Sequence, residues 1–199
     1  MTRSRSSIGP VRNPQTHEAI LAAAEEVLQE YGYGGFTLDL VARRAKASKP
    51  TLYKWWKTKA GLITELYGRQ SAQLLPVPDL GSLHKELLFF CSDLWRLWRE
   101  TTYGEALRSL IAEAQQTPAT RDFLRNELMP MRKQLARALF LRAIDRGEIA
   151  ADVDIEAALV LIMGFHWYRL LIDDMPDEDD LLRMVTMVDN ALTHLPKLE

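Results

Sequence analysis

Apolar residues recur every three or four positions along most of the chain, a period typical of amphipathic helices rather than of strands. Beyond the Pro76-Val77-Pro78 break, this period predicts five helices, at residues 83–100, 104–115, 118–146, 155–172 and 178–194. Nothing in that part of the chain reads as a strand. We therefore expect an all-α protein.

Two short helical patterns meet across a tight turn within residues 36–66. Thr37 is a candidate N-cap for the first of them, because its hydroxyl can accept a hydrogen bond from the first turn. The apolar face of this helix is formed by Leu38, Val41 and Ala42. The pattern ends near Ala45, so residues 46–48 form the turn.

The second helix is expected to begin near Ser48 or Lys49, because Pro50 lacks a backbone donor but fits the first turn of a helix. Leu52 and Trp56, four residues apart, face inward. The side chains left on other faces are Lys49, Thr51, Tyr53, Lys54 and Trp55. Hydroxyl, ammonium and aromatic groups suit phosphates and base edges in a major groove. The pattern predicts a DNA-reading helix-turn-helix.

The run Ser48-Lys49-Pro50-Thr51-Leu52-Tyr53 resembles the recognition helix of the tetracycline-repressor (TetR) family of transcription regulators, which has a T-L-Y core. The resemblance includes an amphipathic first helix ending at Tyr31-Gly32 and the start of a connecting helix at Lys59-Ala60-Gly61-Leu62-Ile63. The chain departs from the family at Lys46, where glycine is common. It departs again at Trp55-Trp56, which replace a His-Phe or His-Tyr pair.

We expect the chain to divide into three parts. Residues 1–13 are rich in Ser, Gly, Pro and Arg, which indicates a flexible basic tail, either a solubilising tail or an arm for an adjacent minor groove. The resemblance implies a three-helix DNA-binding domain at 14–58 and a ligand-binding and dimerisation domain at 59–199. Position by position, the expected base contacts are Ser48, Lys49, Pro50 and Thr51. The expected phosphate contacts are Thr37, Tyr53, Trp55 and Lys59, with Arg43 and Arg44 as further candidates.

Charge is unevenly distributed, although the net charge of the chain is only −2. Residues 1–70 contain eleven Lys and Arg against six Asp and Glu, whereas the remainder contains fourteen against twenty-one. A basic N-terminal third is the electrostatic footprint expected where a polyanion binds. An ordinary solvated basic face remains the alternative for any single residue in it.

The helix expected at residues 155–172 is apolar almost all round, which a surface helix of a monomer would not tolerate. Together with the last helix it predicts a homodimeric four-helix interface, and the TetR resemblance implies the same. The candidate interface residues are Leu159, Ile162, Phe165, Arg169, Leu181, Met184, Val185, Val188 and Leu192. A fully buried monomer core is the alternative.

The middle helices are rich in aromatic residues that can line an apolar pocket with a few polar groups. The candidate ligand-binding residues are Trp95, Trp98, Tyr103, Phe140, Met163, His166 and Trp167. Plain core packing is the alternative for each of them. By resemblance, we expect a ligand that weakens binding to an operator. The Trp and Tyr enrichment indicates a small, largely apolar effector. His166 lies within an apolar run, so it is either the polar contact of this ligand or a hydrogen-bonded core residue.

Other signals narrow the class of protein. The single cysteine, Cys91, excludes an intramolecular disulfide and is interpreted as a buried apolar residue rather than a redox sensor. No signal peptide or membrane span is apparent, so we expect a soluble, cytoplasmic protein.

The acidic run at 173–180 could suggest a magnesium site, but a solvated helix cap is favoured, and no cofactor or metal is expected. An all-helical enzyme and a ligand carrier without a DNA role remain the alternative functions.

Overall fold

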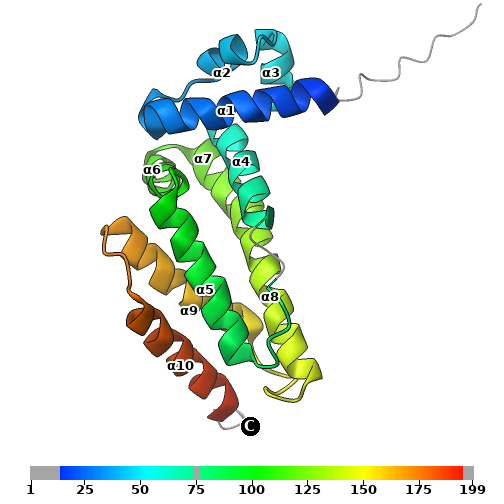
Figure 1. Ribbon diagram of the computed structural model, residues 1–199, viewed down its shortest axis with the longest axis vertical. Helices are drawn as coiled ribbons and strands as arrows, with labels where there is room; N and C mark the ends of the chain where they lie inside the picture. The colour runs from blue at the N-terminus through cyan, green and yellow to red at the C-terminus, as the bar shows by residue number, and fades with distance from the viewer. Residues whose placement is uncertain (1–13, 74–76, 195–199) are drawn as a thin grey trace, which may run out of the picture. The chain divides into compact units, whose positions relative to one another are not determined.

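The computed structural model describes residues 14–73 and 77–194, and every element within these ranges is a helix (Figure 1). The expected all-α class is confirmed. The chain separates into two compact units, Met1–Leu66 and Tyr67–Glu199, called here the N-terminal unit and the larger unit. The expected basic tail at residues 1–13 lies outside the described residues.

The N-terminal unit contains α1 (Pro14–Gly35), α2 (Leu38–Arg44), α3 (Lys49–Trp55) and the first two turns of α4 (Lys59–Gln73). Its core is formed by Ile20, Val27, Phe36, Val41, Leu52 and Leu62, each at most 1% exposed. Within α1, Gly32 has φ 61° and ψ −177°, which is outside the helical region. The regular helix therefore ends there, as the sequence predicted.

The larger unit begins within α4. Ala60, Leu62, Ile63 and Leu66 of that helix are buried and belong to the N-terminal unit. Tyr67 is the first residue of the larger unit.

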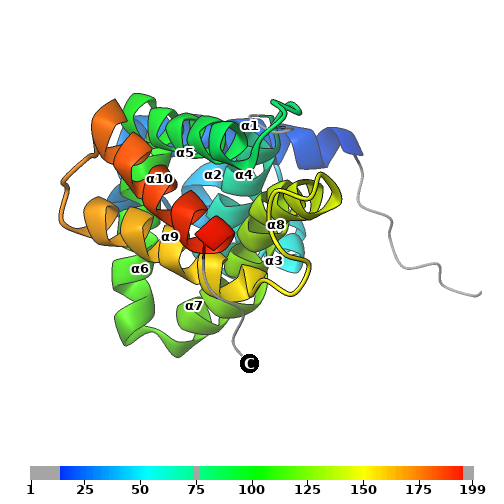
Figure 2. The ribbon, with the colours of Figure 1, turned by 90° about the horizontal axis from the view of Figure 1, so that it is seen from below.

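The helices of the larger unit are α5 (Leu83–Glu100), α6 (Tyr103–Gln116), α7 (Pro118–Phe123), α8 (Met129–Asp145), α9 (Ile155–Leu171) and α10 (Glu178–His194). Helix α5 packs against α6, α8 and α10, and α9 packs against α6, α8 and α10. Figure 2 views this bundle from below, with α9 beside α10. Trp95 and Phe140 are fully buried in its core.

One predicted helix is wrong. The sequence indicated a single helix at residues 118–146, but the structure has a π-helical turn, Leu124–Leu128, between α7 and α8. Pro130 supplies the physical reason, because proline cannot donate the backbone hydrogen bond that a continuous α-helix requires at that position. The other four helices of this region begin and end within one residue of the predicted positions.

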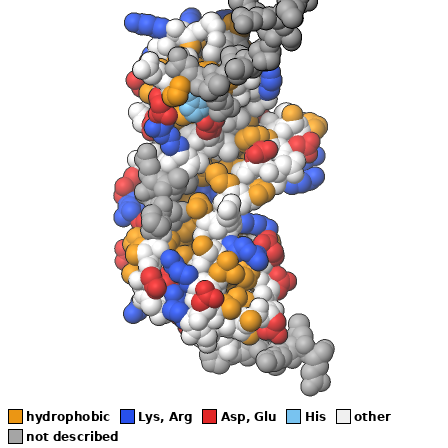
Figure 3. Space-filling view, turned by 90° about the vertical axis from the view of Figure 1, so that its right-hand side faces the viewer, with side chains coloured by type: hydrophobic (Ala, Val, Ile, Leu, Met, Phe, Trp, Pro, Cys, Tyr) orange, Lys and Arg blue, Asp and Glu red, His pale blue; other side chains and the backbone are white. Residues whose placement is uncertain are grey.

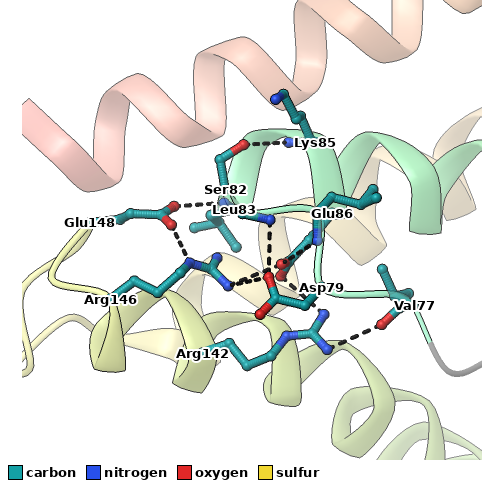
Figure 4. Close-up of polar contacts among 11 residues, drawn as sticks. Val77, Asp79, Ser82, Leu83, Lys85, Glu86, Arg142, Arg146 and Glu148 are labelled. Atoms are coloured by element: carbon teal, nitrogen blue, oxygen red, sulfur yellow. Dashed lines mark hydrogen bonds and ion pairs between the residues drawn. The ribbon is translucent and has the colours of Figure 1, made fainter.

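A buried carboxylate fixes the segment before α5 to the end of α8 (Figure 4). Glu86 is 0% exposed, and its carboxylate lies 3.0 Å from both Arg142 and Arg146. It also accepts a hydrogen bond from the Leu80 amide at 3.2 Å, while Arg142 donates to the carbonyl of Val77 at 3.1 Å. The two guanidinium groups compensate for the burial of the charge.

Candidate nucleic-acid interface

Helix α3 is anchored at its N-terminus by its own sequence. The Ser48 hydroxyl accepts a hydrogen bond from the Thr51 amide at 3.2 Å, and Pro50 occupies the first turn, where its missing donor costs nothing. Leu52 is 0% exposed and Trp56 is 4% exposed, so the predicted inner face is confirmed. The opposite face of α3 is left open to solvent.

The turn before α3 is a left-handed helix cap. Lys46 has φ 51°, and its amide donates to the carbonyl of Arg43 at 3.2 Å. The Ala47 amide donates to the carbonyl of Ala42 at 3.0 Å, which completes a Schellman motif. Lys46 thus adopts a left-handed backbone conformation that usually favours glycine, which lowers the stability of the fold by an amount on the order of 1 kcal/mol.

Asp39 in α2 holds two of the predicted DNA contacts in place. Its carboxylate lies 2.5 Å from the Lys49 ammonium and accepts a hydrogen bond from the Tyr53 hydroxyl at 3.4 Å. The hydrogen bond from Lys49 lowers the pKa of Asp39. Sequence reasoning missed Asp39, because its proximity to α3 depends on how α2 and α3 pack.

The remaining predicted phosphate contacts have other local roles in the free protein. Thr37 caps α2 by accepting from the Leu40 amide at 3.2 Å. The Lys59 ammonium lies 4.1 Å from the ring centre of Tyr33. Trp55 is half-buried, with its ring centre 5.7 Å from that of Trp56.

The two candidate arginines differ in their surroundings. Arg43 is exposed. Arg44 pairs with Glu26 at 3.3 Å and with Glu30 at 2.6 Å, both in α1. A phosphate contact by Arg44 would therefore compete with these two ion pairs, whereas Arg43 could reach DNA more freely.

In the larger unit, three of the predicted ligand-binding residues lie together. The Trp95 indole donates to Nδ1 of His166 at 2.7 Å, and the ring centres of Trp95 and Trp98 are 4.9 Å apart. Nε2 of His166 lies 3.2 Å from the Cys91 sulfur. Burial, with Arg132 nearby, lowers the pKa of His166 to about 3, so the imidazole is neutral at pH 7. Burial raises the pKa of Cys91 to about 12, which makes its thiol unreactive.

Two residues that sequence reasoning missed join this cluster. The Tyr67 hydroxyl accepts hydrogen bonds from the Trp98 indole, at 3.0 Å, and from the guanidinium of Arg132. The ring of Tyr103, another predicted residue, packs edge-on against Tyr67 at 5.9 Å. The sequence contained a signal for Arg132, because it lies four residues before Ala136, in line with the apolar stripe of α8.

The other predicted ligand-binding residues are placed as follows: Phe140 is fully buried, and Met163 and Trp167 are half-buried. A cleft of about 740 Å³ runs along α8, lined by Met131, Leu135, Ala138, Leu141 and neighbouring residues. It contains none of the seven predicted residues. Figure 3 views the side on which α8 lies, where hydrophobic side chains gather among basic and acidic ones.

The predicted dimer residues are divided between the core and the surface. Five of them are buried within their own chain: Leu159, Ile162, Leu181, Met184 and Val185. The other four, which are half-buried, are Phe165, Arg169, Val188 and Leu192. Large apolar side chains that sequence reasoning missed are exposed on the same two helices, among them Leu161 at 70%, Tyr168 at 64% and Met187 at 73%.

Residues 14–73 and 77–194 contain neither a metal-binding cluster nor a membrane-spanning helix. No group of three or more His, Cys, Asp or Glu side chains in these ranges is placed to hold a metal ion. In the acidic run, Asp180 pairs with Arg169 and Arg183, and Asp177 caps α10. No helix in the described part of the chain is long and apolar enough to cross a membrane.

A capped recognition helix with an exposed polar face, followed by a separate helical bundle, defines a helix-turn-helix transcription regulator. Residues 20–66 match the family model described as bacterial regulatory proteins, tetR family. Residues 77–188 match the tetracyclin repressor-like C-terminal domain. The chain belongs to the TetR family of transcription regulators and is not an enzyme.

Full-length relatives support this assignment. The chain is 34% identical over 183 residues to the uncharacterized HTH-type transcriptional regulator YdeS of Bacillus subtilis, with 92% of each chain covered. It is 31% identical over 172 residues to the DNA-binding transcriptional repressor TetR of Mycobacteroides abscessus, covering 84% of this chain and 88% of that one.

Solved structures agree. The TetR family transcription regulator SCO0332 is 30% identical, with a TM-score of 0.79 over 92% of this chain and 99% of that chain. FadR from Bacillus subtilis, solved in complex with stearoyl-CoA, is 20% identical, with a TM-score of 0.60 over 89% and 98%. The second likeness concerns the fold alone.

Proposed function

We propose that the protein is a homodimeric repressor that a small effector releases from a palindromic operator. The observation that carries this proposal is the exposed polar face of α3, which the Ser48 cap and the Asp39 carboxylate hold in a defined geometry. A rigid donor-rich helix face of this kind suits insertion into a major groove. The relative named as a repressor favours repression over activation.

The residues of α3 and its neighbours divide into two kinds of contact. Ser48, Lys49 and Pro50, at the start of α3, are exposed and Thr51 is half-buried, and these four residues would approach base edges. Tyr53 lies one turn further on and would bind phosphate, together with Thr37, Trp55 and Lys59. Arg43, which is exposed, is a further phosphate contact.

The homodimer would form through α9 and α10. Leu161, Tyr168 and Met187 are each more than 60% exposed. Covering apolar side chains of this size with a partner subunit would remove their surface from water and stabilise the dimer. A two-fold axis between two such helix pairs gives a four-helix interface. It would also place two recognition helices about 35 Å apart, which is one turn of DNA.

An effector would act by favouring one conformation. It must bind the conformation that does not bind DNA more tightly than the one that does, since equal affinity for both would change nothing. The cluster around Trp95, Trp98 and His166 is the proposed site. The stearoyl-CoA complex of FadR supports the general idea that this fold can hold an effector.

The proposal is tested by fluorescence anisotropy with duplex DNA from immediately upstream of the protein's own gene, over a salt series and with scrambled DNA as competitor. We expect selective binding with two protomers per site. Tyr53→Ala should weaken binding to all sequences and leave the salt slope unchanged, because it removes a phosphate contact from an uncharged hydroxyl, which releases no counterion. Lys49→Ala should reduce the ratio of operator to scrambled affinity by about tenfold or more.

Lys85→Ala is the matched control, because Lys85 is an exposed lysine in the larger unit. It removes the same charge as Lys49→Ala and should leave both affinities unchanged. If Tyr53→Ala and Lys49→Ala also bind operator as the wild type does, the assignment of α3 as the reading helix is refuted.

A further inference from the structure

The larger unit contains a buried arginine that has no acidic partner among the described residues. Arg132 in α8 is 4% exposed, and burial lowers its pKa to about 10. Within the described residues, its hydrogen-bond partner is the Tyr67 hydroxyl, which is neutral, and its guanidinium lies over the rings of Tyr67 and Trp98 at 5.1 and 5.6 Å. No ion pair joins Arg132 to a carboxylate in residues 14–73 or 77–194.

Hydrogen-bond donors outnumber acceptors around this group. The Tyr67 oxygen already accepts from both Arg132 and the Trp98 indole. Nε of Arg132 is buried and has no acceptor in the described part of the chain. The Tyr67 O–H is a further donor, and an arginine side chain carries five N–H groups and no acceptor. The cluster therefore lacks an acceptor with several lone pairs, which a carboxylate would supply.

The larger unit contains another enclosed group of charges, and in that group each charge has a partner of opposite sign. Arg142 and Arg146 both lie 3.0 Å from the carboxylate of Glu86, so these charges compensate one another. Arg132 has no such partner in the part of the chain that the structure describes, and burying an uncompensated cation is unfavourable. An uncompensated charge at a buried aromatic cluster is typical of a binding site rather than of a stabilising core.

We propose that Arg132 is the anion-binding residue of the effector site and that the effector is an organic carboxylic acid with an aromatic body. This inference rests on the proposed function, because it assumes that a ligand controls the regulator, and it gives that ligand a chemical class. The planar guanidinium can bind both carboxylate oxygens at once. Trp95, Trp98 and Tyr103 would contact the aromatic body.

The geometry also couples the site to α4. Tyr67 belongs to α4, and that helix begins at Lys59 within the N-terminal unit. A carboxylate that accepts from both Arg132 and the Tyr67 hydroxyl would replace the direct hydrogen bond between α8 and α4 by a bridge through the acid, which changes the distance between the two helices. Trp95 and His166 are 0% exposed, so the acid must bind a conformation in which the cluster has opened. Binding would then stabilise that conformation over the packed one.

The test uses the full-length protein with three acids: benzoate, phenylacetate and 3-phenylpropionate. The corresponding amides keep the aromatic body and remove the charge. We expect at least one acid to quench tryptophan fluorescence saturably and to raise the unfolding temperature, with its amide at least tenfold weaker. The same acid should weaken operator binding in the anisotropy assay.

Variants of Arg132 distinguish a residue that binds the carboxylate from one that only packs in the core. Arg132→Met should abolish binding of the acid, and Arg132→Lys should weaken it at least tenfold, because lysine cannot bind both oxygens. Arg137→Met is the control, since Arg137 is an exposed arginine on the same helix, paired with Glu156, and should bind the acid as the wild type does.

The inference is overturned if none of the three acids binds up to its solubility limit, or if acid and amide bind equally. It is also overturned if Arg132→Met binds the acid as tightly as the wild type. Should Arg132→Met fail to fold, Arg132→Lys and the amides decide the question. Selective DNA binding without a response to any acid refutes only the assignment of Arg132 as an acid-binding residue. Acid binding without selective DNA binding refutes only the proposed function as a repressor.

Discussion

His166 should make the stability of the protein depend on pH. Burial lowers its pKa to about 3 in the folded chain, against an ordinary value of about 6.5. Between these two pKa values the unfolded chain binds a proton at His166 and the folded chain does not. The free energy of unfolding is therefore highest above pH 6.5 and decreases as the pH falls toward the pKa of the folded chain. At about 1.4 kcal/mol per pH unit, lowering the pH from about 7.5 to about 5 should cost about 2 kcal/mol through His166 alone.

The measurement is urea unfolding, followed by circular dichroism at both pH values, for the wild type and for His166→Gln. Glutamine can still accept the hydrogen bond from the Trp95 indole, but it does not titrate. The variant is less stable at neutral pH, and its loss on acidification should be about 2 kcal/mol smaller than that of the wild type. Equal losses for the two proteins would refute a neutral, buried His166.

Two further predictions concern stability. Lys46→Gly should stabilise the N-terminal unit by about 1 kcal/mol, because glycine adopts a positive φ without strain. Lys54→Gly, within α3, should destabilise the same unit by a similar amount, and thermal unfolding measures both changes. Glu86→Gln should cost about 3–5 kcal/mol in urea unfolding, because it leaves two arginines without their buried carboxylate. Asp79→Asn, on the exposed side of the same network, should cost about 1 kcal/mol or less, and a similar loss for both would contradict this account.

The helix-turn-helix could be predicted because its signals are local. Thr37 and Ser48 cap their helices through residues three positions further on, and Leu52 and Trp56 are one helical turn apart. By contrast, the contact between Lys49 and Asp39 joins residues ten positions apart on two different helices. Its existence depends on the packing of α2 against α3, which periodicity does not encode.

The proposed dimer interface shows a second limit of prediction from the sequence. Helix α9 is apolar almost all round, so its pattern indicates burial without selecting a face. The structure places Leu159 and Ile162 in the core and leaves Leu161 and Tyr168 exposed. Arg132 was missed for a related reason, because the pattern of a long helix does not show which of its charged residues the packing buries.

The two cations proposed to bind ligands are held in opposite ways, and the difference matches what each would bind. Lys49 is exposed and paired with Asp39, and an exposed pair contributes at most about 1 kcal/mol. DNA could therefore displace Asp39 at little cost, while the pair reduces the charge offered to non-operator phosphates. Arg132 is buried and has no carboxylate partner in the described residues, so no ion pair has to be broken before an acid can bind it. We infer that the first arrangement favours selectivity on a polyanion and the second favours affinity for a single small anion.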